Sequence, residues 1–282
     1  MRFLIPSLTA MLLAGLPPAQ AQTRPLNDTG ITWSSGATSG NATTCNASDP
    51  AGQDCGQGRD RAAADGTLTK VGASAPNSSI TNGFDFTKVC NSGELAGQGT
   101  CPADPVLGPG NDEWACSKDN VTGLVWEIKV NDPGHLRHVG HTYYWYSTDA
   151  TTNGGSPGTS GAGSSTSSGA ACFGSAANRC DTEKFVQDVN VAGLCGATTG
   201  WRMPSIKELH GIADLGRDSP TIDPVFFPNT VPPVSNPPRS YWSGTSYAGG
   251  SDNAWVVDFH NGYAGNNGRE FGLLVRLVRS GP

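Results

Sequence analysis

The chain has 282 residues, a formal net charge of −6, 38 glycines, 20 prolines and only 15% charged residues. This length allows one large domain or two small ones, and the Gly and Pro content favours a loop-rich fold with short elements. Nucleic-acid-binding proteins normally carry a basic excess, so the acidic balance argues against that class.

The first segment, MRFLIPSLTAMLLAGLPPAQAQ, has the pattern of a secretory signal peptide. One Arg precedes an apolar run, and Ala19-Gln20-Ala21 provides a cleavage site of the small-x-small type. We therefore predict cleavage after Ala21 and an exported protein, secreted or held at the cell surface, without a transmembrane helix in the mature chain. Eight Cys in an exported chain favour disulfides over metal thiolates.

Residues 22–115 are dominated by Gly, Ser, Thr, Asn and Asp, and only FDFTKV alternates like a strand. Several Cys lie in or just after this region, so we expect an irregular, disulfide-pinned segment that packs on the following domain. Its acids Asp49, Asp54, Asp60 and Asp65 could hold calcium through carboxylate oxygens. Their spacing lacks the EF-hand pattern, however, and solvated turn residues are the simpler interpretation.

Apolar periodicity improves in residues 116–282, where TGLVWEIK alternates like a half-buried strand and TYYWYS is strand-like. Between them, HLRHVGH places His135, His138 and His141 at a spacing that could gather metal ligands on a helix. The preceding Asp-Pro-Gly and the following β pattern favour a loop instead. The Gly/Ser-rich stretch 150–171 is predicted to be a flexible surface insertion.

Two short helices are predicted next. DTEKFVQDVNVAGL has an apolar stripe with Asp181 as a candidate N-cap, and Cys180 and Cys195 flank it closely enough in sequence to suggest a disulfide between them. PSIKELHGIADLG starts with Ser205 and Glu208 in the spacing of a capping box.

The remaining chain is predicted to form β-strands, SYWSGTSY, NAWVVDF and LLVRLVR, with Asn261-Gly262 as a hairpin turn. Alternation divides NAWVVDFH into two faces. One face is large and apolar and should point into the core: Trp255, Val257 and Phe259. The other should be the more exposed face: Val256, Asp258 and His260.

Seven segments, in one order between residues 114 and 281, resemble the Lcl C-terminal domain family of bacterial surface proteins. They are DNVTGLVWEIK, HTYYWYS, GLCGATTGWRMPSIKEL, IDPVFFPNT, YWSGTSYA, AWVVDFHNGYAG and VRLVRSG. The resemblance implies an α+β fold of C-type lectin-like type, with two short helices, small antiparallel sheets and long irregular loops. It also implies a role in binding at bacterial surfaces.

Some domains of this kind are variable proteins of diversity-generating retroelements, and the closing LLVRLVRSG resembles the fixed tail of such a variable region. The resemblance therefore implies a ligand-binding surface on the hairpin before this tail and on the neighbouring loop. Together with strand parity, it nominates these residues: Tyr247, Asp252, Asn253, Val256, Asp258, His260, Asn261, Tyr263, Gly265, Asn266, Asn267 and Arg269.

Three functions remain open at this point. The first is a retroelement-diversified display protein that binds a protein or cell-surface receptor. The second is a fixed adhesin for glycans such as sulfated polysaccharide, against which the net negative charge counts unless oligomerisation gathers Arg residues on one face. The third is a structural envelope protein with an idle hairpin.

An enzyme is not expected. The formylglycine-generating oxidases use a related fold, but they need redox cysteines in the C-terminal part, and here no Cys follows Cys195. No H-E-x-x-H motif occurs either. We expect no cofactor, with calcium the one ion left open, no nucleic-acid partner and no direct membrane insertion, whereas an oligomer is compatible with the sequence.

Overall fold

The computed structural model describes residues 25–35, 41–42, 45, 52–72, 82–161, 171–173, 178–231 and 239–281. The predicted signal peptide and its cleavage site lie outside these residues. Within them, no helix combines the length and the hydrophobicity that crossing a membrane requires.

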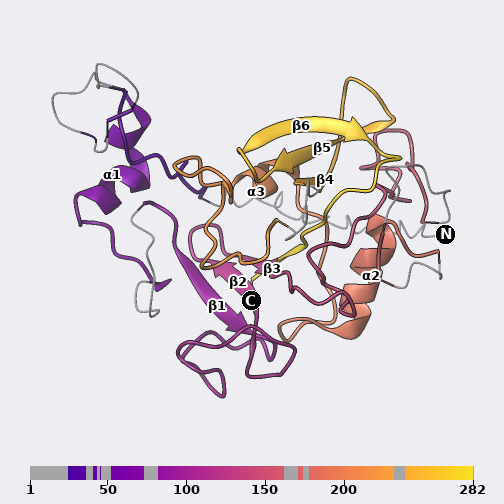
Figure 1. The fold of residues 1–282 in the computed structure, drawn as a ribbon, viewed down its shortest axis with the longest axis horizontal. Coiled ribbons are helices and arrows are strands. Elements are labelled where there is room, and N and C mark those ends of the chain that lie inside the picture. Colours follow the sequence, from indigo (N-terminus) through magenta and orange to yellow (C-terminus); the bar gives the residue numbers. More distant parts are fainter. Residues whose placement is uncertain are drawn as a thin grey trace, which may run out of the picture.

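The fold is α+β, as expected, and contains two small antiparallel sheets (Figure 1). The first has the order β1-β2-β3-β7, from strands Phe86–Cys90, Trp114–Asp119, Leu124–Glu127 and Val278–Ser280. The second has the order β4-β5-β6, from strands Ser240–Ser246, Asn253–Asp258 and Tyr263–Gly268. Figure 1 shows β4, β5 and β6 along the top of the molecule, above the first sheet.

The N-terminal segment is built into the first sheet rather than only packed on it. Strand β1 pairs with β2 from Phe86 opposite Asp119 to Cys90 opposite Trp114. Helix α1, Gly58–Ala64, follows a short 3-10 helix and stands to one side of both sheets (Figure 1).

Both predicted helices form with the predicted caps. Helix α2 spans Thr182–Ala192, and the Asp181 side chain accepts a hydrogen bond from the Lys184 backbone N–H. Helix α3 spans Ile206–His210 and has the complete capping box of Ser205 and Glu208. These local signals depend on short-range hydrogen bonds, so the sequence alone specifies them.

Two hydrophobic cores lie on the two sides of the β4-β5-β6 sheet. The first core contains Val256 with Trp145, Phe185, Trp242 and Leu277. The second core contains residues from α3, both sheets and the hairpin: Phe86, Trp126, Leu209, Val257 and Phe259. The sheet is therefore covered on both faces near β4, in contrast to the expected arrangement with one core face and one exposed face.

This double coverage corrects the prediction from strand parity. Val256 was expected on the exposed face but is only 4% exposed, because its face carries the first core. Val257 and Phe259 are buried as predicted, whereas Trp255, from the same set, is partly exposed.

Four disulfides pair all eight Cys: Cys45–Cys55, Cys90–Cys101, Cys116–Cys195 and Cys172–Cys180. The predicted Cys180–Cys195 bridge is wrong. Helix α2, with 11 residues, separates these two Cys and is about 16 Å long. A disulfide tolerates a Cα–Cα distance of at most roughly 7 Å, so residues beyond opposite ends of this helix cannot pair. Each instead pairs with a Cys beside its own end of α2.

The Gly/Ser-rich stretch is attached to the domain over its first half. Trp145 and Ser147 exchange backbone hydrogen bonds with residues 157–159, and Asn153 is buried. The backbone carbonyl groups of Asn153 and Ser156 also accept hydrogen bonds from the Arg269 side chain, so residues 150–161 have defined contacts with the domain. Residues 162–170 lie outside the described part of the chain.

Candidate ligand-binding surface

The nominated residues lie on a hairpin whose register is continuous. Strands β5 and β6 pair from Asn253 opposite Gly268 to Asp258 opposite Tyr263, which leaves a turn at residues 259–262. Asn261-Gly262 lies within this turn, and Gly262 has a φ of 77° that glycine adopts without steric cost. The turn is longer than the two-residue type that the dipeptide predicts.

Side chains brace this turn from within. The Asp258 carboxylate accepts a hydrogen bond from His260 N–H at 2.7 Å, and the Asn261 side-chain oxygen accepts one from Tyr263 N–H at 3.0 Å. The carbonyl group of Gly262 also lies 3.1 Å from His210 Nε2 in α3. The turn is therefore held both by its own polar residues and by the helix behind it.

The register divides the nominated residues between two faces of the sheet. Alternate residues of a strand point to opposite faces, and paired residues share a face. Asp258, Tyr263 and Gly265 consequently lie on the Val256 face. Asn253 and Asn266 lie on the Val257 face together with Trp255. A ligand on one face cannot contact the complete nominated set.

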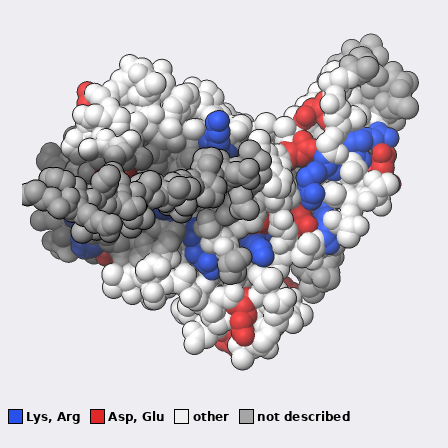
Figure 2. Space-filling model, turned by 180° about the vertical axis from the view of Figure 1, so that it is seen from behind, with Lys and Arg blue, Asp and Glu red and all other residues white. Residues whose placement is uncertain are grey.

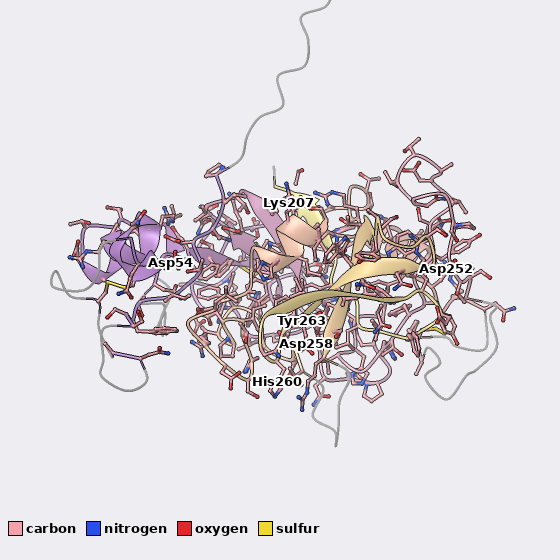
Figure 3. The ribbon with its side chains drawn as sticks, turned by 90° about the horizontal axis from the view of Figure 1, so that it is seen from above. Asp54, Lys207, Asp252, Asp258, His260 and Tyr263 are labelled. Atoms are coloured by element: carbon pink, nitrogen blue, oxygen red, sulfur yellow. A yellow bond between two sulfur atoms is a disulfide. The ribbon has the colours of Figure 1, made fainter. Side chains whose placement is uncertain are left out.

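We define the turn patch as the polar and aromatic residues at the turn end of the hairpin: Asp258, His260, Asn261 and Tyr263. Tyr263 is 65% exposed, and its ring lies across Gly265, where any added Cβ would collide with it. Figure 3 shows Asp258, His260 and Tyr263 together at the turn end of the hairpin, with Asp252 at the opposite end. Gly265 thus provides the space in which an exposed aromatic ring rests on the strand.

We define the open-end patch as five residues at the opposite end of the hairpin and in the neighbouring loop: Tyr247, Asp252, Asn253, Trp255 and Asn266. The Tyr247 and Trp255 rings meet edge to face at 5.3 Å, and Asn253 Nδ2 donates to Asn266 Oδ1 at 2.7 Å. Trp255 was missed as a surface residue because its alternation with Val257 predicts burial. Its neighbour on β6 is Asn266, which is too short to cover an indole ring.

Three nominated residues do not present a side chain to a ligand: Val256, Gly265 and Arg269. Arg269 is 1% exposed, and its guanidinium lies 3.9 Å from the centre of the Trp145 ring. It donates to the carbonyl oxygens of Asn253 at 3.2 Å and Asn153 at 3.0 Å, and also to that of Ser156. Burial lowers the pKa of this guanidinium. Arg269 therefore fastens the end of the hairpin to the 150–161 segment.

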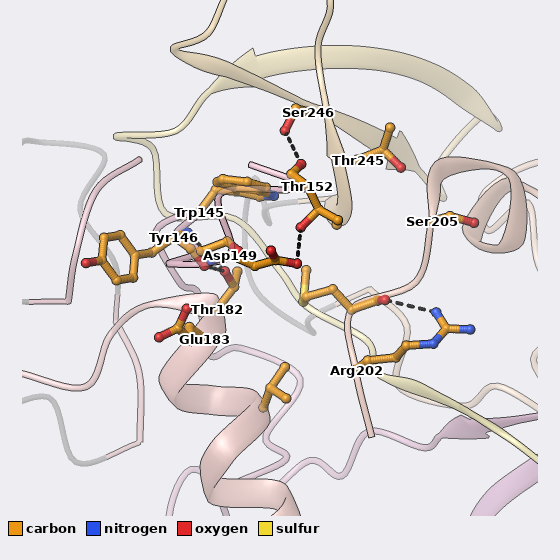
Figure 4. A pocket seen from close by; sticks show the side chains of 14 residues that line it. Trp145, Tyr146, Asp149, Thr152, Thr182, Glu183, Arg202, Ser205, Thr245 and Ser246 are labelled. Atoms are coloured by element: carbon orange, nitrogen blue, oxygen red, sulfur yellow. Dashed lines mark hydrogen bonds between the residues drawn. The ribbon is translucent and has the colours of Figure 1, made fainter. Parts of the chain in front are cut away.

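A pocket of about 670 Å³ opens beside the end of β4, between the start of α2 and residues 202–205 (Figure 4). Its two carboxylates already accept hydrogen bonds from neighbouring threonines. The Asp149 carboxylate accepts hydrogen bonds from the backbone N–H and hydroxyl of Thr151 and from the hydroxyl of Thr152. The Glu183 carboxylate accepts from the backbone N–H and the hydroxyl of Thr148. Ser246 in turn donates to the Thr152 carbonyl at 2.9 Å. These bonds fasten the segment after Tyr146 to α2 and β4.

Residues 115–279 match the sequence profile of the Lcl C-terminal domain. The chain belongs to the Lcl C-terminal domain family. No curated protein and no solved structure matches the chain. The family match begins within β2 and ends within β7, so it contains the complete β4-β5-β6 sheet. Together with the disulfides, family membership indicates a surface-related ligand-binding protein outside the cytosol.

The acids of the N-terminal segment precede the Lcl C-terminal domain. Asp28, Asp54 and Asp60 bring one carboxylate oxygen each within 4.8 Å of one another. Asp60 accepts hydrogen bonds from the Gly30 and Gly83 N–H groups, and burial raises its pKa. Asp65 instead pairs with Arg61, and Asp49 lies outside the described residues. In the described contacts, Asp60 therefore has a structural role, because its carboxylate binds backbone N–H groups of two separate loops.

The three histidines of HLRHVGH lie inside the Lcl C-terminal domain, in a loop rather than on a helix. His135 Nδ1 accepts from Arg137 N–H at 3.0 Å. The His138 and His141 rings are in edge contact, with centres 5.0 Å apart. Burial lowers the pKa of His141 to about 4, and His138 and Lys129 act in the same direction. The local sequence predicted the loop correctly but gave no signal for this ring contact.

Proposed function

We propose that this protein is exported and recognises a protein or cell-surface receptor through the turn patch, without carrying out chemistry on its ligand. The observation that carries the proposal is the exposed Tyr263 ring on a strand with an otherwise small and polar sequence. Tyr, His and Asn offer flat contact area and adaptable hydrogen bonds at a modest ordering cost.

The rigid frame behind the turn patch supports this function. The backbone carbonyl of His260 accepts hydrogen bonds from Ser219 N–H at 2.9 Å and from the Thr221 hydroxyl at 3.1 Å. A loop that is already ordered loses little conformational entropy on binding, and more of the contact energy then contributes to affinity.

Diversification by a retroelement would extend this function to many ligands. Substitutions at Tyr263, Asn266 and Asn267 would leave both cores intact, because no residue of β6 belongs to either core. The DNA next to the gene tests this extension. A reverse-transcriptase gene and a near-copy of the hairpin codons, differing at template adenines, are expected; their absence would favour a fixed binding protein.

The receptor proposal is tested by probing the full chain against an array of secreted and cell-surface proteins. Tyr263→Ala and His260→Ala are each expected to weaken recognition by about tenfold or more. Val191→Ala is the matched control, because Val191 is 86% exposed on α2 and lies outside both patches. Equal binding by all variants would refute a role for the turn patch.

A second candidate, a fixed adhesin for neutral glycans, is favoured by the open-end patch. Tyr247 and Trp255 are both partly exposed, and their aromatic rings can pack on the apolar faces of sugars. The side-chain amides of Asn253 and Asn266 can hydrogen-bond to sugar hydroxyl groups. On a glycan array, Tyr247→Ala and Asn266→Ala should then reduce binding, whereas Tyr263→Ala on the other face should not.

The charge distribution argues against a polyanionic ligand. On the arm of the molecule at the right of Figure 2, the basic side chains have acidic side chains beside them. With a net charge of −6, long-range attraction of sulfated polysaccharide would require Arg residues from several subunits.

A further inference from the structure

His138 and His141 leave two buried ring nitrogens without a protein partner. His138 Nδ1 and His141 Nε2 are both shielded from solvent, and neither has a hydrogen-bond partner among the described residues. A buried polar atom without a partner costs about 1–3 kcal/mol. Such atoms are rare in folded proteins, and one explanation for them is a bound ion. Two in contacting rings point to a shared occupant.

A neutral imidazole carries a lone pair on one of its two nitrogens. The unpartnered nitrogen of each ring is the one that is free to present this lone pair to a metal ion.

The separation of the two rings fits one metal ion. With metal–nitrogen bonds of about 2.0–2.1 Å and a tetrahedral angle, two imidazole rings on one ion have centres roughly 5 Å apart. The observed centres are 5.0 Å apart, with the ring planes at 79°. The separation of the ring centres is therefore compatible with one shared ion.

The local charges tolerate a cation. Lys129 is a buried base whose charge acts on His141, but its ammonium lies 2.7 Å from Glu127 Oε1. The positive charge of Lys129 is thus largely compensated within the core.

We propose that His138 Nδ1 and His141 Nε2 bind one divalent transition-metal ion of the class that prefers imidazole nitrogen, such as Zn²⁺, with water in the remaining positions. The site lies beside residues 171–173, because the His141 and Phe173 rings are 6.2 Å apart and Thr142 and Ala171 exchange hydrogen bonds. This site is independent of the turn patch and of receptor binding.

The test uses the full, disulfide-bonded chain without an affinity tag and Zn²⁺ as the probe. Competition with a chromophoric chelator should show one Zn²⁺ per chain with a dissociation constant on the order of micromolar, and saturating Zn²⁺ should raise the melting temperature. His138→Gln and His141→Gln should each weaken binding by about tenfold or more. His135→Gln is the matched control and should bind normally, because its Nδ1 is already occupied.

A second measurement needs no substitution. In NMR spectra, the ring signals of His138 and His141 should shift when Zn²⁺ is added, whereas the ring signals of His260 in the hairpin should not. The proposal is overturned if the unmodified chain takes up no Zn²⁺ at about 100 µM. It is equally overturned if His135→Gln weakens binding as much as the other two substitutions, or if Zn²⁺ shifts the ring signals of His260 alone.

Discussion

Strands β5 and β6 are hydrogen-bonded neighbours of equal length, yet they have different roles. Strand β5 contributes Val256 to one core and Val257 to the other. Strand β6, YAGNNG, contributes to neither core and carries the exposed Tyr263. In this hairpin, β5 therefore packs in the cores, whereas β6 presents side chains to the solvent.

This division explains how one hairpin can be both stable and open to change. In an ordinary half-buried sheet, each strand packs with one face and displays the other, so every strand carries some of the core. Here the packing is concentrated in β4 and β5, and β6 is the outer strand of the β4-β5-β6 order. Backbone pairing to β5 holds β6 in place without demands on most of its side chains.

The strongest test of this division is the residue that follows β6. Arg269→Met should lower the free energy of unfolding by about 3 kcal/mol, because it removes charge-assisted hydrogen bonds to buried carbonyl groups. Urea denaturation measures this change. Arg269→Lys keeps the charge but loses the planar fork, and it should recover only part of the stability. A loss below about 0.5 kcal/mol would mean that β6 needs no anchor.

The next largest effect is expected in β5. Val257→Ala and Val256→Ala should each cost about 2 kcal/mol, because each leaves a cavity in a packed core. The two losses should be similar, since the strand packs on both faces. If Val256→Ala left the free energy of unfolding almost unchanged in urea denaturation, the sheet would have one core face and one exposed face, as the sequence predicted.

Sequence reasoning succeeded where the determinants are local. The α2 and α3 caps, strands β1, β3, β4 and β5, the 259–262 reversal and the family could be predicted from short patterns. TYYWYS forms only isolated bridges, and LLVRLVR is a strand only from Val278. It failed where distant elements meet. The second core behind Val256, the pairing of Cys195 with Cys116 and the stacking of Arg269 on Trp145 all depend on residues far apart in sequence. In the sequence, Arg269 is recognisable only as a charged residue, and charged residues are mostly exposed. Its burial depends on partners that are distant in the sequence.

A smaller effect is expected at Gly265, beneath the Tyr263 ring. Gly265→Ala should change stability by less than about 1 kcal/mol, because Ala gains in backbone entropy what it loses by displacing the ring. Recognition on the receptor array should fall, because Tyr263 can no longer lie across the strand. Retained recognition would show that the ring position is irrelevant to binding, and Gly268→Ala, elsewhere on β6, provides the comparison.

The smallest change in stability is expected for Tyr263→Ala. The ring is mostly exposed and belongs to neither core, so its removal should cost no more than about 0.5 kcal/mol, mainly through the lower strand preference of Ala. Paired urea denaturation of Tyr263→Ala and Val257→Ala measures the contrast directly. A loss for Tyr263→Ala close to that for Val257→Ala would show that the aromatic ring stabilises the hairpin, and β6 would then be a structural strand like β5. A small loss leaves an exposed aromatic ring without a structural role, which is the property that a recognition residue should have.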